Sequence, residues 1–195
     1  MSAQESKYLG EYFKAVGTVM DQIPGEEVDK TVDILAKVKA AQGRLVILGV
    51  GGSAGSASHA VNDFRKLAGI EAYAPTDNVS ELTARTNDEG WDTVFEKWLR
   101  TSHLRDTDAV MVLSVGGGNL ENNVSPNIVR ALQHAQNVSA KILGIVSRDG
   151  GYTKQVADAC ILIPTFSPET ITPIAESLQA VIWHGIVNHP LLKEP

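Results

Sequence analysis

The sequence predicts an α/β domain in which a five-stranded, mostly parallel sheet is covered by helices on both faces. Short runs rich in β-branched residues alternate with longer amphipathic stretches, a pattern typical of parallel sheets. The predicted strands are near-continuous apolar runs, as expected for strands buried on both sides. A chain of 195 residues that is 43% hydrophobic can fill one core, so we expect one domain with three layers, α/β/α.

The first 42 residues are expected to form a helical hairpin that serves assembly, in front of a doubly wound core at 43–195. Residues 8–23 and 28–41 carry apolar side chains at three- and four-residue intervals, and Pro24-Gly25 separates them.

Strands and helices then alternate along the core. The strongest apolar runs predict strands at 44–49, 108–114, 141–147 and 159–164, with a weaker strand near 71–74. The amphipathic stretches predict helices at 54–67, 91–101, 126–135 and 153–157, and a last helix from about 168 to 188.

Composition excludes several classes of function. Seventeen Lys and Arg against 23 Asp and Glu give a formal charge of −6, which does not favour nucleic acid as a partner. No stretch approaches the eighteen or so apolar residues that span a bilayer, so we expect a cytoplasmic protein without a membrane partner. Cys160 is the only cysteine and lies in an apolar run, which predicts a buried, inert thiol.

The first strong strand runs directly into a glycine-rich turn, from Gly49 through Gly51 and Gly52 to Gly55, and then into a helix. Such a turn can direct backbone N–H groups and a helix N-terminus at an anion, with Ser53 as N-cap or ligand donor. The spacing fits neither the dinucleotide fingerprint nor the P-loop. A phosphate site and a plain tight turn both remain open.

Two pairs of metal-binding side chains lie on predicted helices. His59 and Asp63 are four residues apart, which places them on one helix face. Glu176 and His184 are eight apart on the last helix, roughly 80° from one another around its axis. Either pair alone is more often an ordinary pair of surface residues.

A second glycine-rich loop, residues 114–127, follows the strand at 108–114. Open α/β sheets bind ligands at the carboxyl ends of their strands, where this loop begins. Ser125-Pro126 is typical of the N-cap and first position of the next helix. The alternative is a flexible surface loop.

Taken in order, these motifs resemble the sugar isomerase (SIS) domain family and, within it, the phosphoheptose isomerases. The resemblance spans nearly the whole chain. The segments of this chain that carry the resemblance are Gly49 to Ala54, His59 with Asp63, residues 86–92, the loop 114–127, residues 147–151, and Glu176 with His184.

The chain also departs from the family pattern. Val50 replaces an Asn, Asp63 a Glu and Glu176 a Gln, and Pro173 stands where the family usually has Asp. The loop at 114–127 has lost two hydroxyl side chains, reading Ser114-Val115-Gly116-Gly117, and is six residues longer by our count.

The resemblance implies an aldose–ketose isomerase acting on a sugar phosphate, with sedoheptulose 7-phosphate as the expected substrate. It implies one Zn²⁺, or another divalent metal, bound by His59, Asp63, Glu176 and His184. Asp63 and His184 take the positions of the family's acid and base, and Glu176 offers a further carboxylate. Homotetramers with active sites at subunit interfaces are also implied.

We expect the following residues to bind substrate, through side chains or backbone amides: Gly51, Gly52, Ser53, Asn87, Asp88, Ser114, Gly116, Gly117 and Ser125. For Asn87 and Asp88 the alternative is a loop that caps the helix starting near Trp91.

Two other functions are compatible with the same motifs. One is a non-catalytic SIS module that binds a phosphosugar or a protein, like the relative that associates with the bacterial replication initiator; it predicts neither bound metal nor turnover. The other is a dinucleotide-binding dehydrogenase domain, for which Glu71 lies at a suitable distance to hold a ribose, but no partner domain remains in the chain.

Overall fold

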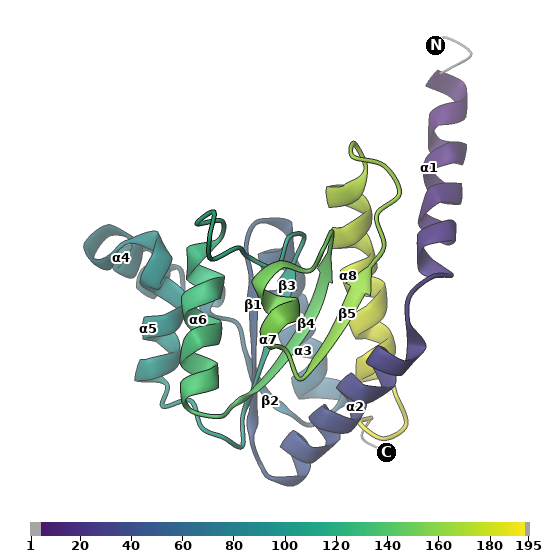
Figure 1. Cartoon of the computed structure of the whole chain (residues 1–195). Coiled ribbons are helices and arrows are strands. Elements are labelled where there is room, and N and C mark those ends of the chain that lie inside the picture. Colours follow the sequence, from purple (N-terminus) through teal and green to yellow (C-terminus); the bar gives the residue numbers. More distant parts are fainter. Residues whose placement is uncertain (1–4, 194–195) are drawn as a thin grey trace.

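The computed structural model describes residues 5–193 and contains one five-stranded sheet with all strands parallel (Figure 1). The strands are β1 (Arg44–Gly49), β2 (Glu71–Tyr73), β3 (Ala109–Ser114), β4 (Lys141–Ser147) and β5 (Ala159–Ile163). Their spatial order is β2-β1-β3-β4-β5. The predicted α/β class and all five strand positions are confirmed within one or two residues.

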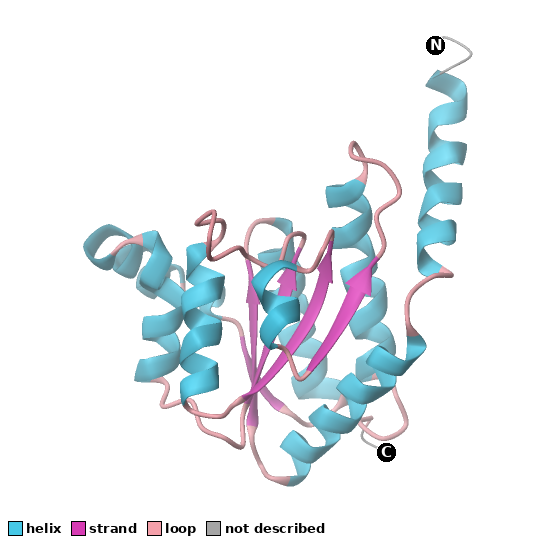
Figure 2. Ribbon diagram, in the orientation of Figure 1, coloured by secondary structure: helices cyan, strands magenta, loops and turns pink. Residues whose placement is uncertain are grey.

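Helices cover both faces of the sheet, as Figure 2 shows. They are α1 (Glu5–Met20), α2 (Gly25–Ala40), α3 (Gly52–Leu67), α4 (Val79–Glu89), α5 (Val94–Thr101), α6 (Pro126–Asn137), α7 (Gly151–Val156) and α8 (Ile171–Val187). Short 3₁₀ turns lie at Pro75–Asp77 and Trp91–Thr93. Within residues 5–193, none of these helices combines the length and apolarity needed to cross a membrane.

The two faces of the sheet bury separate hydrophobic clusters. Alternate strand residues such as Ile47 and Met111 pack with α2, α3 and α8, whereas their neighbours Leu48 and Val112 pack with α5 and α6. This alternation follows from the two-residue period of a strand. It brings α3 and α8, which are a hundred residues apart in sequence, onto the same face.

The N-terminal part of helix α1 extends beyond the sheet in Figure 1 and does not fold back along α2, whereas Ala15 and Val19 in its second half are buried in the core. Tyr8, Leu9 and Phe13 on α1 are each more than half exposed. Both expected N-terminal helices are therefore present, with an apolar surface left open on the first of them.

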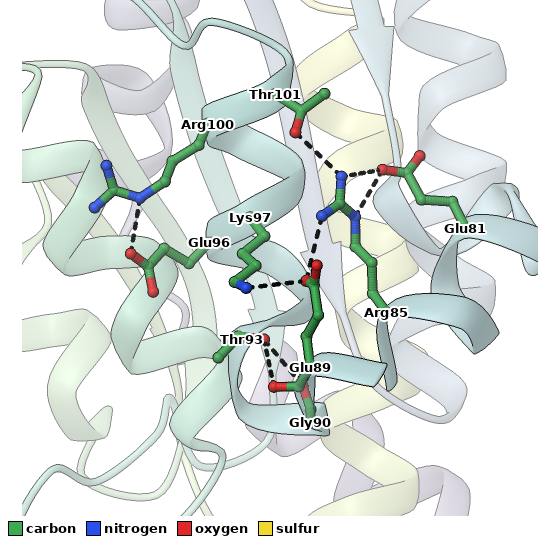
Figure 3. Close-up of polar contacts among 9 residues, drawn as sticks. All are labelled: Glu81, Arg85, Glu89, Gly90, Thr93, Glu96, Lys97, Arg100 and Thr101. Atoms are coloured by element: carbon green, nitrogen blue, oxygen red, sulfur yellow. Dashed lines mark hydrogen bonds and ion pairs between the residues drawn. The ribbon is translucent and has the colours of Figure 1, made fainter. Parts of the chain in front are cut away.

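Helix α4 is an element that the sequence analysis did not predict. It has no buried residue, and polar contacts join it to α5 (Figure 3). Arg85 contacts Glu81 at 2.8 Å and Glu89 at 3.4 Å on its own helix, and donates a hydrogen bond to Thr101 of α5 at 3.1 Å. Lys97 of α5 lies 3.3 Å from the Glu89 carboxylate.

A buried ion pair joins the amino ends of β1 and β3. Asp108 is fully buried and contacts Arg44 at 2.6 Å, and it also accepts hydrogen bonds from the backbone N–H groups of Arg44 and Arg105. Burial alone would raise the pKa of the Asp108 carboxyl, but these hydrogen bonds outweigh it and lower that pKa.

Cys160 lies on the edge strand β5 and is only partly buried. Desolvation nevertheless raises the pKa of its thiol to about 11. The thiol is therefore protonated at neutral pH, in agreement with the expectation of an inert cysteine.

Candidate active site

The turn between β1 and α3 is as tight as its glycines suggest. Gly51 has a φ of 63° and occupies the N-cap position of α3. A side chain at Gly49 would collide with the carbonyl of Ser53. The N-terminal turn of α3 therefore lies directly at the carboxyl end of β1, where its N–H groups are available to an anion.

Ser53 has a different local role from the one expected. The N-cap is Gly51, and the buried Ser53 hydroxyl donates a hydrogen bond of 2.9 Å to Oε1 of Gln179 on α8. The amide of Gln179 in turn donates to the carbonyl of Ile145 on β4 at 3.4 Å. Gln179, which the predicted site did not include, thus ties α8 to both the glycine turn and the sheet.

His59, Asp63 and His184 converge from the two helices α3 and α8. Oδ2 of Asp63 lies 3.9 Å from Nε2 of His59 and 3.6 Å from Nε2 of His184. One ligand atom from each of the three residues lies within 4.8 Å of the others. Three of the four predicted metal ligands are therefore brought together.

Hydrogen bonds orient the members of this group. Nδ1 of His184 lies 2.7 Å from the carbonyl of Ala180, and since a carbonyl only accepts, Nδ1 carries the proton. In the neutral ring, Nε2 then presents its lone pair to the Asp63 carboxylate. Asn62 donates to the other Asp63 oxygen, Oδ1, at 2.8 Å, which leaves Oδ2 facing both imidazoles.

This donor set fits a divalent metal. Two imidazole nitrogens and a carboxylate oxygen are ligands that zinc prefers, and a ring whose second nitrogen donates to a backbone carbonyl is the usual state of a metal-binding histidine. A lone pair and a carboxylate oxygen repel one another unless a cation or a proton lies between them. The group therefore suits either a metal or a shared proton.

Trp183 forms the apolar wall behind the group. Its ring is fully buried, stacks on His184 at a centroid distance of 3.7 Å and meets His59 edge-on at 4.8 Å. Stacking on a rigid indole restricts the rotation of both imidazoles. Sequence reasoning missed Trp183, although its place beside His184 on the last helix offered a signal.

Glu176 lies apart from the other three predicted metal ligands. Its carboxylate sits against Gly52, at the first residue of α3, where any side chain on Gly52 would strike it. Glu176 and His184 are separated by eight residues of one helix, about 12 Å at 1.5 Å per residue, so they point at opposite ends of the same site. In this arrangement Glu176 is an acid at the glycine turn rather than a member of the group.

The loop after β3 is held firmly at its beginning. The hydroxyl of Ser114 accepts a hydrogen bond of 3.0 Å from the N–H of Gly117. The carbonyl of Gly117 accepts from both the hydroxyl and the N–H of Thr153 on α7, at 2.7 and 2.9 Å. Of the expected substrate ligands, Ser114, Gly116 and Gly117 therefore lie on ordered backbone at the carboxyl end of β3.

Further along the loop, Ser125 is the N-cap residue of α6, as expected, but its side chain does not cap the helix. It adopts a left-handed conformation with φ 49°. The adjacent Asn127 is fully buried, and its Nδ2 has no hydrogen-bond partner within the described residues.

Asn87 and Asp88 lie on α4 rather than on a loop. Both are exposed and hydrogen-bond to each other at 2.7 Å. Figure 1 shows α4 on the opposite side of the molecule from α8, so within one chain these two residues do not join His184.

Comparison with known proteins identifies a family and several related sequences. The SIS domain family matches residues 11–147. The phosphoheptose isomerase of Rhodospirillum rubrum is 30% identical over 77% of this chain and 79% of its own length. That of Syntrophotalea carbinolica is 29% identical over 89% of this chain and 87% of its own.

Solved structures show the same fold. A phosphoheptose isomerase from Neisseria gonorrhoeae superposes with a TM-score of 0.79 and 24% identity, covering 96% of this chain and 98% of that one. A phosphoheptose isomerase from Francisella tularensis gives the same TM-score at 19% identity.

Proposed function

The chain belongs to the SIS domain family, in its phosphoheptose isomerase branch, and on this premise we propose that it interconverts sedoheptulose 7-phosphate and D-glycero-D-manno-heptose 7-phosphate. It is a sugar phosphate isomerase of the aldose–ketose type. The observation that carries the proposal is the meeting of His59, Asp63 and His184 from two distant helices, close to a glycine turn.

The reaction moves a proton between C1 and C2 of the sugar. Removing a proton beside a carbonyl forms an enediolate, so the site needs a base at one carbon and an acid at the oxygen. Oδ2 of Asp63 and Nε2 of His184 face one another at 3.6 Å. We assign the acid and base roles to this pair, with Glu176 as the second candidate for the base.

His59, Asp63 and His184 would hold a divalent metal, whereas Glu176, which the sequence analysis expected as a fourth ligand, lies at the glycine turn. When bound, zinc supplies positive charge that polarises the substrate carbonyl and stabilises the developing enediolate. Trp183 excludes water from the back of the imidazoles, which strengthens electrostatic interactions in the site.

The phosphate and hydroxyl groups of the substrate would bind at the carboxyl ends of β1 and β3. The N–H groups of Gly51, Gly52 and Gly116 would hold the phosphate without carrying charge, whereas the N–H of Gly117 already donates to the Ser114 hydroxyl. Ser114 and Ser125 would contribute hydroxyl oxygens, whereas the buried hydroxyl of Ser53 is bonded to Gln179.

We also propose that the site is completed by a neighbouring copy in a homotetramer. Within one chain, Asn87 and Asp88 lie away from His184. A neighbouring chain could bring its own Asn87 and Asp88 to the site. The exposed apolar side chains of α1 also indicate a contact with a neighbouring copy that would bury them.

The test is elemental analysis of protein purified without added metal, together with an aldose–ketose assay on seven-carbon sugar phosphates using the same sample. We expect about one divalent ion per chain, turnover of sedoheptulose 7-phosphate, and loss of turnover on chelation that zinc restores. Binding of the sugar phosphate with neither metal nor turnover would instead establish the non-catalytic SIS module.

A further inference from the structure

A cavity lies between α5, α6 and the loop that follows β3. It is separate from the residues assigned to the isomerase site, although it shares the loop that carries some of them. Its volume is about 410 Å³. Its polar lining consists of Glu96, Arg100, Asn119, Asn123, Arg130, Gln133, His134 and Asn137. His59, Asp63, Glu176 and His184 are absent from this lining.

The two arginines keep most of their hydrogen-bonding capacity free for a ligand. Arg100 donates to Glu96 through Nε alone, at 2.9 Å, and Arg130 contacts Asp92 through one terminal nitrogen at 2.7 Å. Their side chains are 56% and 47% exposed. A guanidinium has five N–H donors, so each retains several that can hold a phosphate or carboxylate.

His134 provides a second, independent indication of a ligand. The residue is only 7% exposed, yet its ring makes no hydrogen bond within residues 5–193. Burial, assisted by the nearby Arg100, lowers the pKa of the imidazole, which favours its neutral form. A neutral ring offers one donor and one acceptor, and His134 lines the cavity, where a ligand can use both.

The loop wall of the cavity is a small, ordered hairpin. Asn119 and Val124 exchange backbone hydrogen bonds of 2.8 and 3.0 Å, and the side chain of Asn119 accepts from the N–H of Asn122 at 2.7 Å. This hairpin presents Asn119 and Asn123 to the cavity. Amide side chains at fixed positions are suited to bind hydroxyl groups, which both donate and accept.

We propose that this cavity binds a hydroxylated organic anion of the size of a sugar phosphate, separately from the isomerase site. Arg100 and Arg130 hold the anionic group, and the amides of Asn119, Asn123 and Gln133, with His134, hold the hydroxyls. The proposal rests on this cavity alone and does not depend on the proposed function.

The test is equilibrium dialysis of the whole protein with D-glucitol 6-phosphate, which has no carbonyl group and cannot be isomerised. Inorganic phosphate and D-glucitol are measured separately. The test variants are Arg100→Gln and Arg130→Gln. The matched control is Lys97→Gln: Lys97 lies on the same helix, is 44% exposed and pairs with one carboxylate, but extends toward α4, away from the Arg100–Glu96 pair (Figure 3).

At subsaturating concentrations, we expect the wild type and Lys97→Gln to bind more D-glucitol 6-phosphate per chain than either arginine variant. Loss of one charged hydrogen-bonding group should weaken binding at this site about tenfold or more. Because the site is measured as a difference between variants, the result is independent of any binding at the isomerase site and of turnover.

Three results would overturn the proposal. One is equal stoichiometry and affinity in the wild type and both arginine variants. Another is an equal loss in Lys97→Gln, which would show only a general effect of charge. The third is inorganic phosphate binding as tightly as the ester, since hydroxyl recognition would then contribute nothing.

Discussion

At the scale of single residues, the position of one carboxylate decides how the site can work. Asp63 is a methylene shorter than the glutamate of the family pattern, yet its Oδ2 lies within 4 Å of both imidazoles. Glu176, which adds a carboxylate to the site, lies at the glycine turn instead. The arrangement therefore separates an acid–base group around Asp63 from a negative charge at the N-terminus of α3.

Replacing Glu176 by Gln tests this separation. We expect turnover to stay within about tenfold of the wild type, because Asp63 and His184 move the proton. The KM for the sugar phosphate should fall about two- to fivefold, because a charge that competes with phosphate at a helix N-terminus is removed. Steady-state kinetics and metal analysis of the same samples give both values.

Glu169→Gln, at an exposed site in the loop before α8, is the control for this change. Weaker metal retention with unchanged turnover would make Glu176 a ligand only. A loss of turnover of about a hundredfold with the metal retained would make Glu176 the base and contradict the assignment of Asp63.

The resemblance to the SIS domain family allowed His59, Asp63 and His184 to be identified, and helical periodicity placed His59 and Asp63 on one face of their helix. It did not reveal the position of Glu176, which depends on the side-chain rotamer and on how α8 crosses α3. The link from Ser53 to Gln179 was also hidden, because it joins residues 126 positions apart. Such contacts follow from packing and not from local pattern.

At the scale of elements, the strands were the easiest to predict and α4 the hardest. Strands buried on both faces give continuous apolar runs, and each lies within two residues of its expected range. Helix α4 has few apolar residues and buries none, so its period is weak. A capping signal was present: Asn78 accepts a hydrogen bond from the N–H of Glu81, three residues later.

Because ion pairs and hydrogen bonds attach α4 to α5, we expect its attachment to be weak and sensitive to salt. Arg85→Met should increase amide hydrogen exchange across Val79–Glu89 severalfold, as should high salt in the wild type. The free energy of unfolding should change by only about 1 kcal/mol or less. Hydrogen exchange read by mass spectrometry and a urea titration measure the two effects.

Lys141→Met, which removes a surface ion pair with Asp158 far from α4, is the control and should leave exchange in α4 unchanged. Global destabilisation by about 3 kcal/mol in Arg85→Met would show that α4 is part of the cooperative core.

At the scale of the whole molecule, the buried pair of Asp108 and Arg44 links stability to pH. The pKa of Asp108 is lowered in the folded state, so its contribution is complete above its ordinary pKa and is lost as the pH falls through the lower folded value. Asp108→Asn should reduce the free energy of unfolding at pH 7 by about 3–5 kcal/mol, because Arg44 loses its partner.

Denaturant titrations from pH 7 to pH 2 measure this effect, and the difference between Asp108→Asn and the wild type should shrink as the pH falls below 3.8, the ordinary pKa of this carboxyl. Asp92→Asn, at a half-exposed ion pair with Arg130, should cost about 1 kcal/mol or less. A deficit for Asp108→Asn that is constant with pH would exclude the titration of this carboxyl as its cause.

Assembly is the second property of the whole molecule, and α1 is the element that bears on it. Phe13 is 65% exposed on α1. If the proposed homotetramer uses α1 as a subunit contact, Phe13→Ala removes apolar area from that contact and should lower the mass measured by light scattering from four copies of the chain. Glu11→Ala, exposed on the same helix, should leave the mass unchanged, and an unchanged mass in both variants would place the contact elsewhere.

The central claim is that Asp63 and His184, contributed by two helices, perform the proton transfer of a sugar phosphate isomerase. The most direct measurement is conversion of sedoheptulose 7-phosphate, followed by NMR, in the wild type, Asp63→Asn, His184→Gln and the exposed control His103→Gln. We predict turnover in the wild type and in His103→Gln, and losses of at least about a hundredfold in the other two. Turnover retained in Asp63→Asn and His184→Gln, or absent from the metal-loaded wild type, would contradict the claim.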